Sequence, residues 1–250
     1  MAWDGGPGDE PAPAWRDQAP DRRSPIDPNA PVSGHGAPGP RGPSPADAPE
    51  QDWTAAMPRL FPVLRPLDSR GTRLADLEPA RLATEGLKTH ADPVVDDGPA
   101  GIPVAYAIRA EAFDVLVNAD HLLAWGVGPE ALRSAAIANL AAWSAAAPWS
   151  DEASGRRQLR FSASGGGGDA ARILLPEVLA HLGTELGREG RVLVGLPGRD
   201  LLVAGALVPG DDEFAALFAE FVREQAVDAD EPIDLRVLEL VDGRIVPFAG

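Results

Sequence analysis

The sequence contains no cysteine, which excludes disulfide bonds, iron–sulfur clusters, thiolate zinc sites and a cysteine nucleophile. Histidine is nearly as scarce. The four histidines are His35, His90, His121 and His181, and none belongs to an HxxxH or HExxH pair of the kind that binds a metal from one face of a helix. We therefore expect neither a metal site nor a cofactor.

Positive charge and long apolar runs are also in short supply. The chain has 22 Lys and Arg against 38 Asp and Glu, a net charge of -16, which disfavours contact with DNA, RNA or anionic lipid surfaces. The longest apolar run, Leu201 to Val208, is too short to cross a bilayer, and the first residues lack the apolar core of a signal peptide. We expect a cytoplasmic protein that binds neither nucleic acid nor membranes.

Glycine and proline, by contrast, are abundant and unevenly placed. The chain has 27 Gly and 26 Pro, and the first 50 residues alone hold 7 Gly and 12 Pro. A stretch with so little apolar periodicity cannot offset the entropy of ordering, so the sequence predicts a disordered tail over residues 1–56 and one domain over 57–250. Trp3, Trp15 and Trp53 in this tail are either ordinary exposed side chains or docking anchors for a partner.

The rest of the chain alternates strand and helix patterns. Residues 66–101 give no clear assignment, because prolines and a glycine interrupt the apolar spacing. Elsewhere the patterns predict an edge strand at 60–65, a strand at 159–162, hairpins at 103–117, 191–208 and 235–248, and helices at 118–126, 129–146, within 170–187 and from 211 or 212. Because hairpins require antiparallel neighbours, we expect an α+β fold with a mostly antiparallel sheet covered by helices.

The glycine run Gly165 to Gly168, followed by Asp169, admits two interpretations. A strand, a glycine-rich turn and a helix start can point backbone N–H groups at a phosphate. No Walker lysine follows, however, and Asp169 places a carboxylate where the phosphate would lie. A tight or flexible turn, with Asp169 as the helix N-cap, is the simpler interpretation. Pro176 either kinks the following helix or opens it after a separate turn.

Charged residues gather around this turn and around the turn at Pro197-Gly198. They are Arg172, Arg199, Asp169 and Asp200, with Arg65 at the end of the first strand. One hypothesis is that they form salt bridges and fix the turns, Arg172 pairing with Asp169 three residues away. The other is that the three arginines converge to hold a carboxylate or phosphate through bidentate contacts.

No catalytic set is evident. Asp96-Asp97-Gly98 resembles only half of a calcium loop, and Ser162 and Ser164 lack the Gly-x-Ser-x-Gly elbow of a nucleophile. The sequence therefore favours a non-enzymatic binding or regulatory module with a possible protein partner. The alternative is an enzyme or small-anion binder that uses the arginine cluster, with catalytic residues unknown.

Four segments, in order, resemble the YtpQ-like family of bacterial proteins, whose function is unknown. They are Phe61-Pro62-Val63-Leu64-Arg65, Asn139-Leu140, Gly167-Gly168-Asp169-Ala170-Ala171-Arg172-Ile173-Leu174, and Leu196-Pro197-Gly198-Arg199-Asp200-Leu201-Leu202-Val203. The chain departs from the family at Gly168, where the family has an aromatic residue, and at Gly198, where it has a polar one. The resemblance covers about residues 60–250 and implies the fold and a cytoplasmic location, but no catalytic residue.

Overall fold

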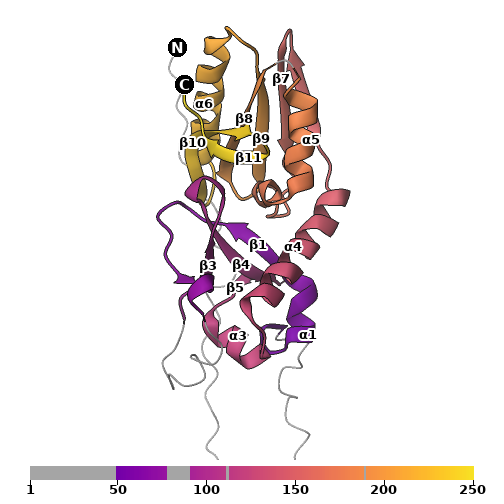
Figure 1. Cartoon of the computed structure of the whole chain (residues 1–250), viewed down its shortest axis with the longest axis vertical. Coiled ribbons are helices and arrows are strands. Elements are labelled where there is room, and N and C mark those ends of the chain that lie inside the picture. Colours follow the sequence, from indigo (N-terminus) through magenta and orange to yellow (C-terminus); the bar gives the residue numbers. More distant parts are fainter. Residues whose placement is uncertain (1–48, 78–90, 111–112, 189) are drawn as a thin grey trace, which may run out of the picture. The chain divides into compact units, whose positions relative to one another are not determined.

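The computed structural model describes residues 49–77, 91–110, 113–188 and 190–250 (Figure 1). Most of the predicted tail, residues 1–48, lies outside these ranges. Residues 49–56, also predicted as tail, instead form a 3-10 turn, Pro49–Gln51, and a short helix, α1 (Trp53–Ala56). Asp52 caps α1 by accepting a hydrogen bond from the Ala55 amide at 3.0 Å, and Ala56 is fully buried. The folded part therefore begins before residue 57.

Two sheets, rather than the single sheet expected, form the framework. The first sheet has the order β1-β4-β3-β2, with β5 also paired to β4; its strands are β1 (Leu60–Leu64), β2 (Thr72–Arg73), β3 (Val94–Asp97), β4 (Pro103–Arg109) and β5 (Asp114–Leu116). The second has the order β11-β10-β8-β9-β7-β6; its strands are β6 (Ser150–Ser154), β7 (Arg157–Ser162), β8 (Arg191–Gly198), β9 (Leu201–Leu207), β10 (Pro232–Val241) and β11 (Arg244–Pro247).

After residue 118, the helices follow the predicted boundaries closely. They are α3 (Ala119–Trp125), α4 (Pro129–Ala146), α5 (Pro176–Leu186) and α6 (Asp212–Val227), with 3-10 turns at Met57–Arg59, Leu74–Asp76, Pro99–Gly101 and Ala170–Leu174. Asn118 caps α3 through the His121 amide, and Gly126 ends it in the left-handed conformation with φ 66°. Pro176 opens α5 after a separate 3-10 turn, which settles the two interpretations of that segment.

Pairing in both sheets is antiparallel, except that the two-residue strand β2 runs parallel to β3. The predicted α+β fold with mostly antiparallel pairing is thus confirmed. β1 lies at the edge of the first sheet, as predicted. Pro62, which has no N–H to donate, is tolerated there because an edge strand pairs with only one neighbour. The β10–β11 hairpin turns at Asp242 and Gly243, both with positive φ, as the Asp-Gly pair predicts.

Helix α6 lies on one face of the second sheet, over β8 and β10. Its buried side chains are Phe214, Phe218, Val222 and Ala226. Two glycines in the sheet permit this close contact. A Cβ at Gly195 would lie 2.4 Å from a Val222 methyl group, and one at Gly205 would lie 2.9 Å from the Phe214 ring. Helix α5 packs against β8 and β9 within a different core cluster, one that also includes side chains of the first sheet.

Candidate functional site

The two predicted turns lie side by side. The Ala170 amide donates to the Arg199 carbonyl at 3.2 Å, and the Asp200 carboxylate accepts a hydrogen bond from the Gly167 amide. Gly167 has φ +67°, and a Cβ there would lie 2.2 Å from the Arg199 Nη2. Glycine is therefore favoured at this position by the left-handed backbone, whereas the Arg199 guanidinium stands at the end of a flexible side chain that could move aside. The loop N–H that could have faced a phosphate is occupied by a carboxylate of the protein.

Asp169 and Arg172 form a buried network through Ser162. Asp169 is 0% exposed and accepts hydrogen bonds from the hydroxyls of Ser162 and Ser164. Arg172, 2% exposed, donates to the Ser162 hydroxyl at 2.7 Å and to the Ser144 hydroxyl at 3.0 Å. Asp169 holds the N-cap position of the Ala170–Leu174 turn, as predicted, but its side chain makes no capping hydrogen bond, because its carboxylate accepts from the two serine hydroxyls instead.

The sequence spacing predicted a direct ion pair between Asp169 and Arg172. In the structure Ser162 instead lies between them and hydrogen-bonds to both. Arg172 instead turns toward α4 and places its guanidinium 3.9 Å from the centre of the Trp149 ring. Burial lowers the pKa of Arg172, while the charge of Asp169 opposes that shift. The network lies in the interior of the protein, and its members Ser144 and Arg172 also line a cavity of about 310 Å³.

The other two arginines have acceptors of their own. Arg65 pairs with Glu231 at 2.8 Å, and Arg199 pairs with Asp114 at 2.6 Å. The structure therefore brings Asp169, Arg172, Arg199 and Asp200 into adjoining segments but engages the three guanidinium groups with separate partners. This arrangement matches the salt-bridge and turn-fixing hypothesis rather than an arginine clamp.

Arg109, which the sequence did not single out, lies beside the same loop at the end of β4. Its guanidinium stacks on the Phe61 ring at 3.6 Å and lies near Trp143. Within the described residues its buried Nη2 has no hydrogen-bond partner. Burial is the largest influence on the Arg109 pKa and lowers it, while the carboxylates of Asp114, Asp200 and Asp169 act in the opposite direction.

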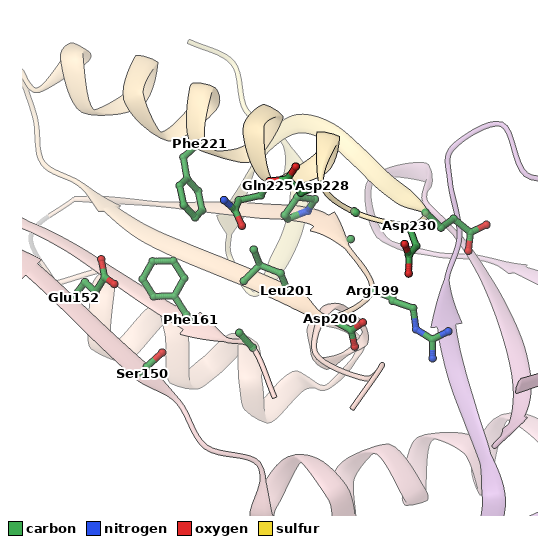
Figure 2. Close-up of a pocket in the computed structure, with 15 residues that line it drawn as sticks. Ser150, Glu152, Phe161, Arg199, Asp200, Leu201, Phe221, Gln225, Asp228 and Asp230 are labelled. Carbon is green, nitrogen blue, oxygen red and sulfur yellow. The ribbon is translucent and has the colours of Figure 1, made fainter. Parts of the chain in front are cut away.

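A cavity of about 600 Å³ opens between the C-terminal half of α6, strand β7 and the β8–β9 turn (Figure 2). The rings of Phe161 and Phe221 meet edge to face at this cavity, with centres 6.0 Å apart. Its ionisable lining residues are five carboxylates and one guanidinium: Glu152, Asp200, Asp228, Asp230, Glu231 and Arg199. The cavity thus has an aromatic floor and an acidic rim.

Three of these carboxylates are uncompensated. Within the described residues, Glu152, Asp228 and Asp230 have no hydrogen-bond or ion-pair partner for their side chains. Arg199 does not neutralise them, because its guanidinium extends away from the two rings (Figure 2) toward Asp114. The cavity therefore presents negative charge to whatever enters it.

A second, apolar cavity of about 310 Å³ continues along α6 from the first. It shares Glu152 and Phe221 with the acidic cavity and adds Leu159 of β7 and Leu217 of α6. Arg157 at its far end is paired with Asp211 and Glu213, both at 2.7 Å. We call the two cavities together the α6 groove; its further apolar lining residues are Phe214 and Phe218.

The α6 groove was not predicted as a site. The sequence predicted only that helices cover the sheet, yet Leu217 of α6 is 46% exposed and Phe221 is only partly buried. The apolar stripe of this helix is wider than the surface that the sheet covers. One feature of the sequence could have indicated this groove. The acidic residues of the segment Asp228 to Glu231 directly follow the amphipathic helix.

In the described part of the chain, no group of three or more His, Cys, Asp or Glu side chains is arranged to hold a metal ion. None of the helices in those residues is long and apolar enough to cross a membrane. No family model, curated protein or solved structure matches this chain. The resemblance to the YtpQ-like family accordingly stays a prediction.

Proposed function

We propose that this protein is a non-enzymatic binding module whose α6 groove takes a cationic group. The observation that carries the proposal is the set of unpaired carboxylates, Glu152, Asp228 and Asp230, placed around the paired rings of Phe161 and Phe221. A cation with an apolar body would gain ion pairing at the rim and cation–π contact at the floor. A cytoplasmic location and membership of the YtpQ-like family belong to the same proposal.

The residues that line the groove favour binding over catalysis. Hydrolytic or transfer chemistry needs a nucleophile next to a base, or an acid and a base held at matched pKa values. The acidic cavity combines carboxylates with Phe161, Phe221, Leu201, Ser150 and Gln225, and its lining includes neither histidine nor lysine. The alternative of a small-anion site is not favoured, because an anion would meet the negative rim.

Small cations should bind weakly. An exposed ion pair contributes about 0.2–1 kcal/mol, and an exposed cation–π contact about 0.5–1 kcal/mol. A few such contacts correspond to a dissociation constant in the millimolar range, since about 4 kcal/mol corresponds to roughly 1 mM. The measurement must therefore tolerate high ligand concentration.

An NMR titration of the full chain with N-acetylarginine amide tests the proposal. We expect the backbone amides of Asp200, Asp228 and Asp230 to shift progressively, and the double variant Asp228→Asn/Asp230→Asn to lose most of that response. Glu220→Gln is the matched control, because Glu220 is exposed on α6 but lines neither cavity. If N-acetylglutamate amide shifts the same signals equally, or if none of them moves, the proposal is wrong.

A further inference from the structure

We infer that the natural occupant of the α6 groove is a basic amphipathic helix of a partner protein, packed beside α6 on the open face of β6 and β7. This inference rests on the proposed function and names the class of partner. It follows from four observations: an uncovered strip of sheet, the width of that strip, the exposed apolar residues of α6, and the unequal distribution of charge along the groove.

The uncovered strip is formed by β6 and β7. The register pairs Glu152 with Leu159 and Ser150 with Phe161, so these four side chains lie on one face of the sheet. It is the face on which α6 lies, since Phe161 meets Phe221 and Leu159 lines the apolar cavity with Phe214 and Phe218. Leu159 and Phe161 remain only partly buried, because α6 lies mainly over β8 and β10 and only its aromatic side chains reach β7.

The width of the strip suits one helix. Neighbouring strands lie about 4.8 Å apart, so two strands offer about 10 Å. An α-helix with its side chains is about 10 Å across, and packed helices lie about 8–10 Å apart. A partner helix laid on β6 and β7 would therefore also touch α6 along the side that carries Leu217 and Phe221. α6 has 16 residues, which gives a track of about 24 Å.

The charge along the track is unequal, which sets the composition of the partner. At the end near Phe214 and Leu217 the groove is apolar. Arg157 is the one cation among the described residues that line this end, and it is already paired with Asp211 and Glu213. At the other end Asp228 and Asp230 lie next to the C-terminus of α6, where the helix dipole adds further negative potential. An apolar stripe for the first end and Lys or Arg residues for the second describe a basic amphipathic helix.

A second copy of this chain does not meet that description. Each α-helix in the described residues is neutral or acidic, as the acidic residues in α5 and α6 illustrate. The net charge of -16 also makes two copies repel each other. A basic helix of a different protein would carry the positive charge that this chain's own helices lack, and it would be attracted rather than repelled by the net negative charge of the chain.

The test uses the full chain and two fluorescein-labelled synthetic peptides made of leucine, alanine and arginine. In the amphipathic peptide the leucines recur at i, i+3, i+4 and i+7; in the scrambled peptide the same residues have no common face. By fluorescence anisotropy we expect the amphipathic peptide to bind at least about tenfold more tightly than the scrambled one, and binding to weaken as salt is raised. Equal binding of the two peptides would overturn the inference.

Matched variants on α6 locate the contact. Leu217→Gln should weaken binding of the amphipathic peptide about tenfold, whereas Val227→Gln should leave it unchanged, since Val227 is 83% exposed and lines neither cavity. Asp228→Asn/Asp230→Asn should weaken binding and flatten its salt dependence. Leu217 and Val227 are both exposed, so we expect both variants to fold. Far-ultraviolet circular dichroism of each variant checks this.

The outcomes separate the two proposals. If N-acetylarginine amide binds in the groove but Leu217→Gln does not affect the peptide, the cation site stands and the helix partner is wrong. If neither the amide nor the peptide binds, both proposals fail. If the peptide binds and only Val227→Gln weakens it, the contact lies on another face and the inference is overturned.

Discussion

At the scale of single residues, Ser162 has an unusual position between two buried charges. Its hydroxyl donates to Asp169 and accepts from Arg172 at 2.7 Å, so it joins a carboxylate and a guanidinium that are not in direct contact. A buried charge without partners is strongly destabilising, whereas one with satisfied hydrogen bonds is tolerated. The small hydroxyl therefore allows both charges to remain inside the protein.

Ser162→Ala should destabilise the protein by about 1–3 kcal/mol, because the substitution leaves a donor and an acceptor unsatisfied in the interior. Ser164→Ala is the matched control: Ser164 also donates to Asp169, at 2.8 Å, but it is exposed, and water can replace it. We expect that variant to lose at most about 1 kcal/mol. Urea denaturation measures both, and equal losses would contradict the proposed role of Ser162.

At the scale of secondary-structure elements, a carboxylate joins two strands and a helix. Asp96 of β3 accepts hydrogen bonds from Tyr106 of β4 at 2.6 Å and from Arg133 of α4 at 2.7 Å. Burial raises the pKa of Asp96, but the hydrogen bonds from Arg133 and Tyr106, with the charge of Arg133, outweigh burial and bring the pKa below its usual value. The folded state therefore favours the ionised form.

A pKa that folding depresses contributes stability above the unfolded pKa, near 4 for aspartate, and that contribution is lost as pH falls through the folded pKa. We therefore expect Asp96→Asn to destabilise the protein more at about pH 6 than at about pH 3. Urea denaturation of both proteins at the two pH values gives the comparison. An equal difference at both would show that ionised Asp96 contributes nothing.

The contact between α6 and the second sheet depends on Gly195. Gly195→Ala should cost about 1–3 kcal/mol, because the new methyl group meets Val222 in a packed layer. Gly183→Ala, in α5, has room, with its nearest neighbour at 3.7 Å, and should stabilise the protein by up to about 1 kcal/mol through helix propensity. The midpoint temperature of thermal unfolding should thus fall for Gly195→Ala and rise for Gly183→Ala.

The elements with strong periodicity could be predicted from the sequence. α4, α6 and the β8–β9 and β10–β11 hairpins follow from apolar spacing and turn residues. β6 could not be predicted, because Ser150 to Ser154 are all exposed and carry no apolar alternation. β2 and β3 were missed because they are short and their pairing is decided by tertiary contacts.

The α6 groove was not predicted as a site, for a related reason. The sequence marked Arg199 and Asp200 because they lie at a Pro-Gly turn, and both line the acidic cavity. Glu152 comes from a strand with no apolar pattern, and Phe221 resembled an ordinary core residue. Which part of an apolar stripe stays uncovered depends on where the neighbouring sheet ends, and the helix sequence does not contain that information.

At the scale of the whole molecule, the largest buried cluster is shared by both sheets. It includes Phe61 of β1, Val104 of β4, Val194 and Leu196 of β8, and Ile173 between them in sequence. Neither sheet could lose its packing without exposing part of this cluster. The described elements should therefore behave as one cooperative unit.

We expect unfolding in urea to give a single transition, with the same midpoint by far-ultraviolet circular dichroism and by tryptophan fluorescence. Trp125 lies by the first sheet's core and Trp149 packs on Arg172 beside the second, so fluorescence reports on both. Leu196→Ala should lower both midpoints together, because it should reduce the free energy of unfolding by about 2–5 kcal/mol. Separate midpoints would contradict a shared core.

β6 has one further consequence. As the outermost strand of its sheet, it leaves a row of backbone amides and carbonyls without a neighbouring strand, which is the usual template for stacking one molecule onto the next. Glu152 lies on this border without a paired cation among the described residues, so two copies that met there would bring like charges together. The short polar ribbon that leaves room for a partner beside α6 thus also protects the protein against edge-to-edge polymerisation.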